Sequence, residues 1–203
     1  MVALTTRRED ARPGRGEDRV EVVSLADRTV VVVADGAGGV AGGATTAEII
    51  CKAVVERCRR GGVDGWAQYL STIDREMIKG SGLAAAVVVE VRNDGSVVGA
   101  SVGDCEAWTF PTGSKPRNLT AEQVRKPLLG EGAASPVGFE THVKGCSLLV
   151  ATDGLWKYLD RARIAKAAAT RPLETACDLL VASVRLRSGA LQDDVAVAII
   201  ECK

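Results

Sequence analysis

Residues 29–43 read TVVVVADGAGGVAGG, an apolar run that stops at an aspartate and continues into a glycine-rich loop. The β-branched run predicts a strand that is buried on both faces. A second Val-rich stretch occupies residues 19–25, so we expect a hairpin that turns at residues 26–28. From Ala44 apolar residues recur at helical spacing as far as Gly61, and a helix is therefore expected to follow the loop.

The rest of the chain groups its expected strands and helices in blocks. An Asn-Asp-Gly turn at residues 93–95 is a hairpin signal, and residues 111–139, with four of the six prolines, are expected to form a long surface excursion. This block order predicts an α+β layered sandwich and not a doubly wound parallel sheet. Further strands are expected at 83–91, 97–102, 107–110, 147–152 and 195–200. Further helices are expected after an Asp64 cap, with Trp66, Leu70, Ile73 and Met77 on one side, and at 155–159, 161–170 and 172–187.

Length and charge limit the classes of protein that this chain can belong to. Its 203 residues predict a single domain over residues 1–203. Residues 1–16 are expected to be loosely ordered, because their apolar residues do not recur at a regular spacing. Lys plus Arg and Asp plus Glu both number 26, so no net charge attracts the chain to nucleic acid or to an anionic membrane. The longest apolar run, residues 83–89, is far shorter than the roughly 20 residues of a spanning helix. With no secretory signal at the start, we expect a cytoplasmic protein without a membrane segment.

The six cysteines and the single histidine are not arranged for zinc binding or for nucleophilic catalysis. No CxxC pair occurs, and one histidine cannot complete a zinc site. We expect the cysteines to be reduced, and Cys51 and Cys58 to be buried on one face of their helix. His142 lies outside every acidic motif and is expected to be non-catalytic.

Three aspartates occupy the same position relative to apolar strands. Asp35 follows VVVVA, Asp153 follows LLVAT, and Asp193 lies just before VAVAII. Carboxylates at the ends of buried strands repel one another unless they are protonated or bridged by cations. Only oxygen ligands are available, which favours Mg²⁺ or Mn²⁺ over zinc. A divalent metal centre is therefore predicted. Asp35 and Asp153 are each followed by a glycine, and either Asp-Gly pair taken alone fits an ordinary turn at the end of a strand equally well.

The glycine loop also nearly fits two nucleotide-binding motifs, and both fail. Residues 38–45 lack the lysine that reaches the phosphates in a P-loop, because Ala44 occupies its position. Residues 36–41 approach the dinucleotide fingerprint, but Glu56 falls inside the expected helix and not at the end of a second parallel strand. The metal-centre hypothesis therefore accounts better for this loop.

Five segments follow one another in an order that a known family shares. They are VVVADGAGGVAGG for the family's DGxGG, GSGLAAAVV for its GTT segment, ASVGDCEAW for GDSRAY, LLVATDGLWKYL for SDGLWD, and QDDVAVAII for the closing DNxT strand. With these segments the chain resembles the bacterial, compact members of the PP2C-type (PPM family) metal-dependent serine/threonine protein phosphatases, which act in signalling. The resemblance implies a four-layer α/β/β/α sandwich of two mainly antiparallel β-sheets flanked by helix pairs. It also implies hydrolysis of phosphoserine or phosphothreonine in proteins by a metal-activated water.

The resemblance further implies metal-binding roles for individual residues. Asp35 would bridge two metal ions, with the Gly36 carbonyl on one of them, while Asp153 and Asp193 would hold the other. Asp104 matches the aspartate that, in bacterial members, helps Asp153 to hold a third metal. The implied cofactors are two Mg²⁺ or Mn²⁺ ions per active site and a weaker third ion.

The acidic pair and the phosphate-binding arginine of the family belong near the first strand. Glu17 or Asp18 matches the acidic pair. The arginine normally lies four residues earlier, where this chain has Pro13. Arg12 and Arg15 flank that position, and because a guanidinium binds phosphate through two hydrogen bonds, either is a candidate, with Arg12 favoured.

Other departures from the family pattern leave alternatives open. Cys105 replaces the family's serine, and residues 119–123 read LTAEQ in place of LTxDH, so the flap is altered. Asp194 replaces asparagine and would either raise metal affinity or hydrogen-bond its loop. The leading hypothesis is a monomeric enzyme that acts on phosphorylated protein and opposes a Ser/Thr kinase, with no nucleic-acid or membrane partner. The alternatives are a catalytically weak binding module of this fold, a pseudophosphatase, or a phosphatase of a small phosphate ester.

Overall fold

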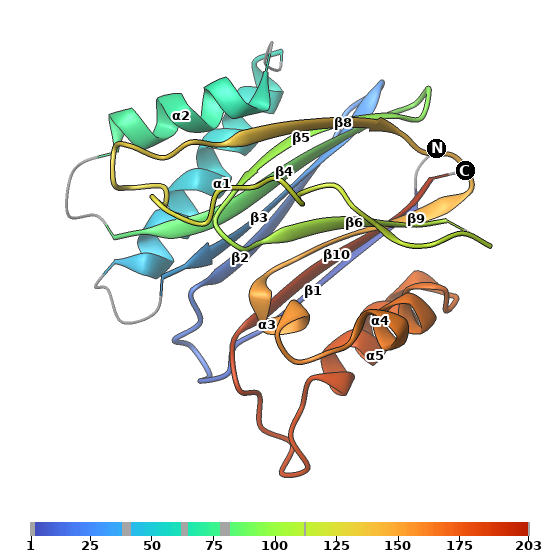
Figure 1. Cartoon of the computed structure of the whole chain (residues 1–203). Coiled ribbons are helices and arrows are strands. Elements are labelled where there is room, and N and C mark those ends of the chain that lie inside the picture. Colours follow the sequence, from blue (N-terminus) through green and yellow to red (C-terminus); the bar gives the residue numbers. More distant parts are fainter. Residues whose placement is uncertain (1–2, 38–41, 62–64, 78–81, 112, 203) are drawn as a thin grey trace.

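Within the residues that the computed structural model describes, 3–37, 42–61, 65–77, 82–111 and 113–202, two five-stranded sheets pack face to face (Figure 1). All neighbouring strands in both sheets are antiparallel. The first sheet consists, in spatial order, of β1 (Ala3–Glu9), β10 (Val195–Cys202), β9 (Cys146–Ala151), β6 (Glu106–Pro111) and β7 (Arg117–Asn118). The second consists of β2 (Asp18–Ser24), β3 (Arg28–Gly36), β4 (Ala84–Arg92), β5 (Ser96–Val102) and β8 (Val137–His142).

Helices cover the outer face of each sheet (Figure 1). The second sheet is covered by α1 (Gly43–Arg59) and α2 (Trp66–Glu76). The first is covered by α4 (Arg161–Ala168) and α5 (Leu173–Ser183), with the short α3 (Asp153–Trp156) at the end of β9. The expected α+β class and the four-layer sandwich of two antiparallel sheets flanked by helices are confirmed.

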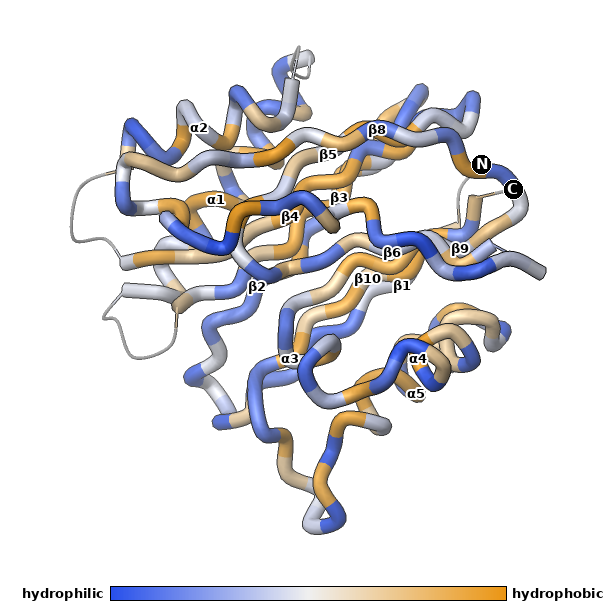
Figure 2. Tube along the Cα trace, in the orientation of Figure 1, coloured by the Kyte–Doolittle hydropathy of each residue, from blue (hydrophilic) through white to orange (hydrophobic). Residues whose placement is uncertain are grey.

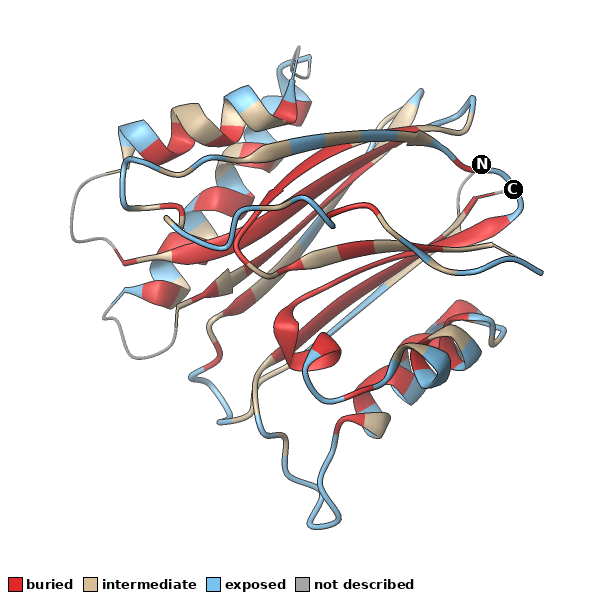
Figure 3. Ribbon diagram, in the orientation of Figure 1, coloured by how far each residue is buried: buried red, intermediate tan, exposed pale blue. Residues whose placement is uncertain are grey.

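The interior strand β3, which lies between β2 and β4, is buried on both of its faces, as its sequence predicts. Val31 and Val33 point into the core between the two sheets, whereas Val30, Val32 and Ala34 point toward α1 and α2. Figure 2 shows hydrophobic residues along the central strands of both sheets, and Figure 3 shows that these strands are buried. When apolar layers cover both faces of a strand, its side chains do not alternate between polar and apolar, which explains the uninterrupted valine run.

Residues 3–9 were expected to be loosely ordered, and this expectation is wrong. They form β1, which pairs with β10 along its whole length, from Ala3 opposite Glu201 to Glu9 opposite Val195. Because β1 is an edge strand with exposed side chains such as Arg7, its own sequence shows little apolar period. The partner that orders it lies almost the full length of the chain away.

The excursion expected over residues 111–139 is held to the protein more firmly than its composition indicates. It contains β7 and the start of β8, so part of it belongs to the sheets. The carboxylate of Asp74 is 2% exposed and anchors a further part of this segment. It accepts backbone hydrogen bonds of 2.7 to 3.0 Å from Gly130, Gly132 and Ala134. A buried carboxylate with three donors ties the segment to α2.

The remaining elements agree with the sequence expectations to within a few residues at their ends. The expected Asp64 cap and residues 38–41 and 80–81 of the glycine-rich segments lie outside the described residues; α2 starts after Gly65. All six cysteines are buried and free. Among the helices in the described ranges, none combines the length and the apolar character that crossing a bilayer requires.

Candidate metal centre

One end of the sandwich carries a cavity of ≈ 330 Å³ with a mostly acidic wall. Strands β3, β5 and β9 end at this side of the molecule, and β10 begins there, so residues from distant parts of the sequence meet. All three strand-end aspartates line the cavity. Its charged lining consists of Glu17, Asp35, Asp104, Asp153, Asp193, Asp194 and Lys157.

Three of these carboxylates lie close enough to share one cation. Oxygen atoms of Asp35, Asp104 and Asp153 lie within 4.8 Å of one another. Oxygens that bind a single Mg²⁺ at about 2.1 Å can lie up to about 4.2 Å apart, so small side-chain rotations would complete the contact. Carboxylates are also the donors that Mg²⁺ and Mn²⁺ prefer. The residues present therefore fit a hard divalent cation, and Asp193 lines the same cavity outside this group of three.

Burial and nearby carboxylates make Asp35 and Asp153 hard to ionise. Burial, followed by the charges of Asp18 and Asp153, raises the pKa of Asp35 to about 10. Burial also raises the pKa of Asp153, although a hydrogen bond from Lys157 opposes the change. A bound cation would favour the ionised forms and remove the repulsion between them. The electrostatics of the cavity therefore agree with the donor set in pointing to a cation.

The structure distinguishes the two acidic candidates at the start of β2. Asp18 is 1% exposed, lies opposite Asp35 in the β2–β3 register, and accepts a hydrogen bond of 2.7 Å from the Thr152 hydroxyl. Burial raises the pKa of Asp18 to about 7, although the Thr152 hydrogen bond acts in the opposite direction. Glu17, in contrast, lines the cavity. Of the pair, Glu17 is the member that can reach a ligand there.

Asp194 hydrogen-bonds its loop, which is one of the two roles left open by the sequence. Its Oδ1 accepts from the backbone N–H of Ala11 and its Oδ2 from that of Glu17, both at 2.7 Å. An asparagine would offer only one acceptor oxygen, with an NH₂ group facing the second donor. The aspartate therefore suits this position and holds the segment between β1 and β2 against the start of β10.

The structure does not bring the two candidate phosphate-binding arginines to the cavity. Arg12 and Arg15 are exposed in a turn closed by a 2.9 Å hydrogen bond between their backbones, and neither lines the cavity. Lys157 lines it instead, a residue that none of the sequence motifs singles out as a site residue. Its spacing of four from Asp153, at the start of a helix, was the signal that could have identified it.

Glycines after two of the aspartates permit close approach of the backbone. A Cβ at Gly154 would lie 1.8 Å from the carbonyl oxygen of Asp194, and one at Gly36 would lie 2.4 Å from the carbonyl carbon of Gly43. Both neighbours are backbone atoms, so side-chain rotation cannot relieve the contact. The two Asp-Gly pairs are therefore required for packing around the cavity and are more than turns at strand ends.

Gly154→Ala is expected to destabilise the protein by about 2–3 kcal/mol, because the added methyl group overpacks against backbone. The shift of the backbone at Asp194 should also weaken Mn²⁺ binding. Urea denaturation measures the first effect and calorimetry the second. Gly138→Ala is the matched control, since its Cβ would lie 3.8 Å from its nearest neighbours, and its stability should stay within about 0.5 kcal/mol of the wild type. Equal stability of the two variants would contradict this account of Gly154.

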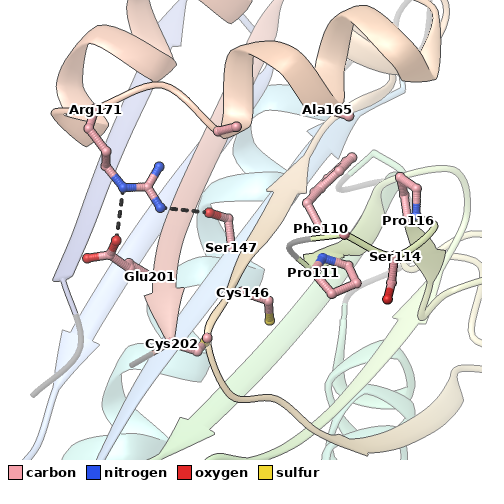
Figure 4. A pocket seen from close by; sticks show the side chains of 13 residues that line it. Phe110, Pro111, Ser114, Pro116, Cys146, Ser147, Ala165, Arg171, Glu201 and Cys202 are labelled. Carbon is pink, nitrogen blue, oxygen red and sulfur yellow. Dashed lines mark hydrogen bonds and ion pairs between the residues drawn. The ribbon is translucent and has the colours of Figure 1, made fainter.

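A larger cavity, of ≈ 480 Å³, lies at the opposite end of the first sheet (Figure 4). Its arginine is already engaged by the fold: Arg171 donates to Glu201 at 2.9 Å and to Ser147 at 3.1 Å. The same guanidinium also donates to the backbone carbonyls of Ala168 and Thr170. Since these contacts use the guanidinium for structure, the acidic cavity is the better candidate for phosphate chemistry.

Three solved structures share this fold. RsbX in complex with magnesium has a TM-score of 0.78 and 15% identity, over 100% of this chain and 96% of that chain. A bacterial serine phosphatase has a TM-score of 0.84 and 15% identity, over 100% and 98%. The catalytic domain of the serine threonine protein phosphatase PstP in complex with two manganese ions has a TM-score of 0.76 and 15% identity, over 98% and 97%. At these identities the similarity shows the fold alone.

Sequence comparison is informative at the level of the family. No curated protein matches the chain. The family described as Stage II sporulation protein E (SpoIIE) matches residues 26–203, which include all five motif segments in full and most of the sandwich. The resemblance to PP2C-type phosphatases drawn from those motifs is confirmed by this match and by the shared fold. The chain belongs to the SpoIIE family.

Proposed function

We propose that this protein is an Mg²⁺- or Mn²⁺-dependent phosphatase that hydrolyses phosphoserine or phosphothreonine in proteins. The observation that carries the proposal is the convergence of the Asp35, Asp104 and Asp153 carboxylates to within 4.8 Å in an acidic cavity. Membership of the SpoIIE family and a fold shared with bacterial serine/threonine phosphatases support it.

The proposed ligands come from four strand ends. Asp35, Asp104 and Asp153 would hold one cation, and Asp193 would join Asp153 at another, with the Gly36 carbonyl close by. The chemistry that divalent cations supply at such a site is activation of a water and neutralisation of phosphoryl charge. The rigid strand ends keep the carboxylates in place before substrate binds, so little reorganisation is required during the reaction.

Direct attack by water is favoured over a covalent enzyme intermediate. Among the described residues that line the cavity, none is serine, threonine, cysteine, histidine or tyrosine. Cys105 is fully buried, and burial raises the pKa of its thiol, which makes it a poor nucleophile. His142 is exposed at the end of β8 and its Nε2 lies 2.9 Å from the Asp94 carbonyl oxygen, outside the cavity. The chain therefore supplies ligands and orientation at this site.

The substrate and setting follow from the same proposal. We expect a phosphorylated protein as the substrate, in opposition to a Ser/Thr kinase, and a monomer that acts in the cytoplasm. Six buried, free cysteines are compatible with a reducing compartment, where disulfides are rare.

With Mn²⁺ the purified protein is expected to hydrolyse p-nitrophenyl phosphate and phosphoseryl or phosphothreonyl peptides, and EDTA should abolish both activities. Release of p-nitrophenol and of inorganic phosphate measures them, and excess Mn²⁺ should restore them. A preference for small phosphate esters over phosphopeptides would favour the small-ester alternative. Tight Mn²⁺ binding by calorimetry without turnover of any of these substrates would favour a pseudophosphatase.

A further inference from the structure

Lys157 is the one cationic residue among the described residues that line the acidic cavity. Its ammonium group forms an ion pair with Oδ2 of Asp153 and lies 3.5 Å from Oδ2 of Asp193. The side chain of Asp153 is only 12% exposed, so the contact is shielded from solvent on the carboxylate side. A positive charge of this chain therefore already bridges two of the proposed metal ligands.

The geometry of α3 holds Lys157 next to Asp153. The backbone N–H of Lys157 donates to the Asp153 carbonyl at 2.8 Å, which closes a helical turn and places the two side chains on one face. Trp156 fixes this turn, because its indole N–H donates to the Ala151 carbonyl at 3.0 Å and the Arg161 guanidinium lies 4.7 Å from its ring centroid. The backbone of Lys157 is therefore held in place, and only rotation of its side-chain methylene groups can move the ammonium group away.

The charge balance of the cavity gives this contact its importance. Six acidic residues line the cavity, and Lys157 contributes a single positive charge. Asp194 is already satisfied by two backbone N–H groups. Asp153 and Asp193 instead use the ammonium group. An ammonium group and a divalent cation require the same carboxylate oxygens, so the two cations exclude each other there.

We infer that Lys157 is an internal counter-ion that competes with the divalent cation for Asp153 and Asp193. This inference rests on the proposed metal centre. Without a divalent cation, the ammonium group offsets the repulsion between carboxylates and stabilises the fold. A divalent cation must displace the ammonium group, so its affinity is lower than that of the same carboxylates without the lysine. Lys157 therefore sets the concentration at which the site fills.

The test compares Mn²⁺ binding to the full chain and to Lys157→Met by isothermal titration calorimetry at one pH and ionic strength. Methionine keeps an unbranched stem and removes the charge, and the Mn²⁺ dissociation constant should fall by about tenfold. The melting temperature of the metal-free variant should be lower than that of the wild type, and Mn²⁺ should raise it by more. Lys157→Gln repeats the comparison with a polar side chain in case the methionine variant folds poorly. Lys166→Met, at an exposed position of α4, should bind Mn²⁺ as the wild type does.

The outcomes separate this inference from the proposed function. Unchanged or weaker Mn²⁺ binding in the Lys157 variants would overturn the inference and leave the metal centre standing. That result combined with a higher Michaelis constant would assign the lysine to substrate binding instead. A lack of Mn²⁺ binding in the wild type and in every variant would overturn the metal centre itself, and the competition with it.

Discussion

Asp35→Asn is expected to lower phosphatase activity by about 10²- to 10³-fold and, at the same time, to raise the melting temperature of the metal-free protein. Asparagine keeps the shape of the side chain and loses the charge that would bind a cation. It also removes the carboxyl group whose pKa is raised by burial and by nearby aspartates to about 10. Because folding then no longer requires protonation of this group at neutral pH, the metal-free fold should gain stability.

Initial rates at saturating Mn²⁺ measure the first effect, and thermal denaturation in EDTA measures the second. Asp178→Asn is the matched control, since Asp178 lies on α5 with a side chain that is 63% exposed. It should change neither quantity. Wild-type activity in Asp35→Asn would contradict its role as a ligand, whereas a lower melting temperature in EDTA would contradict the repulsion described above.

The melting temperature of the metal-free protein is expected to fall by about 10 °C as the pH rises from about 5 to 9. The pKa of Asp18 is raised from 3.8 to about 7 and that of Asp35 from 3.8 to about 10, chiefly by burial in both cases. Between the unfolded and folded pKa values, the folded state binds more protons than the unfolded state. Stability contributed by these groups is therefore complete below the unfolded pKa and is lost as the pH rises toward the folded pKa.

Saturating Mg²⁺ should remove most of this pH dependence, because a cation takes over the charge compensation that protons provide. Asp35→Asn in EDTA should show a shallower slope than the wild type. Differential scanning calorimetry across the pH range, with and without Mg²⁺, provides the measurement. A melting temperature in EDTA that stays constant or rises over this range would contradict the folded-state pKa values.

Local patterns were sufficient to predict much of the fold. The valine run of β3, the hairpin turn at residues 93–95 and the helical spacing after Ala44 each depend on residues close together in the chain. Apolar residues that recur every two residues show which face of a strand is buried, and those that recur roughly every 3.6 residues show which face of a helix is buried. The positions of Asp35 and Asp153 at strand ends followed from the same patterns.

Contacts between segments that are distant in the sequence could not be predicted from those local patterns. The order of β1 depends on β10, and its polar edge-strand sequence does not reveal that partner. The role of Asp194 depends on the N–H groups of Ala11 and Glu17, which backbone packing alone brings near. For this reason the motif comparison pointed to Arg12 and Arg15, which do not line the cavity, and gave no sign of Lys157, which does.

The sequence by itself determined the layered α+β class, the motif order and the residues that can bind a divalent cation, because apolar period and residue chemistry are local properties. The tertiary structure alone decided that Asp35 lies within reach of the Asp104–Asp153 pair, that Glu17 and not Asp18 faces the cavity, and that Lys157 bridges Asp153 and Asp193. Those relations depend on strand register and on the approach of separate loops. Both are set by packing across the whole sandwich, which no single stretch of the chain specifies.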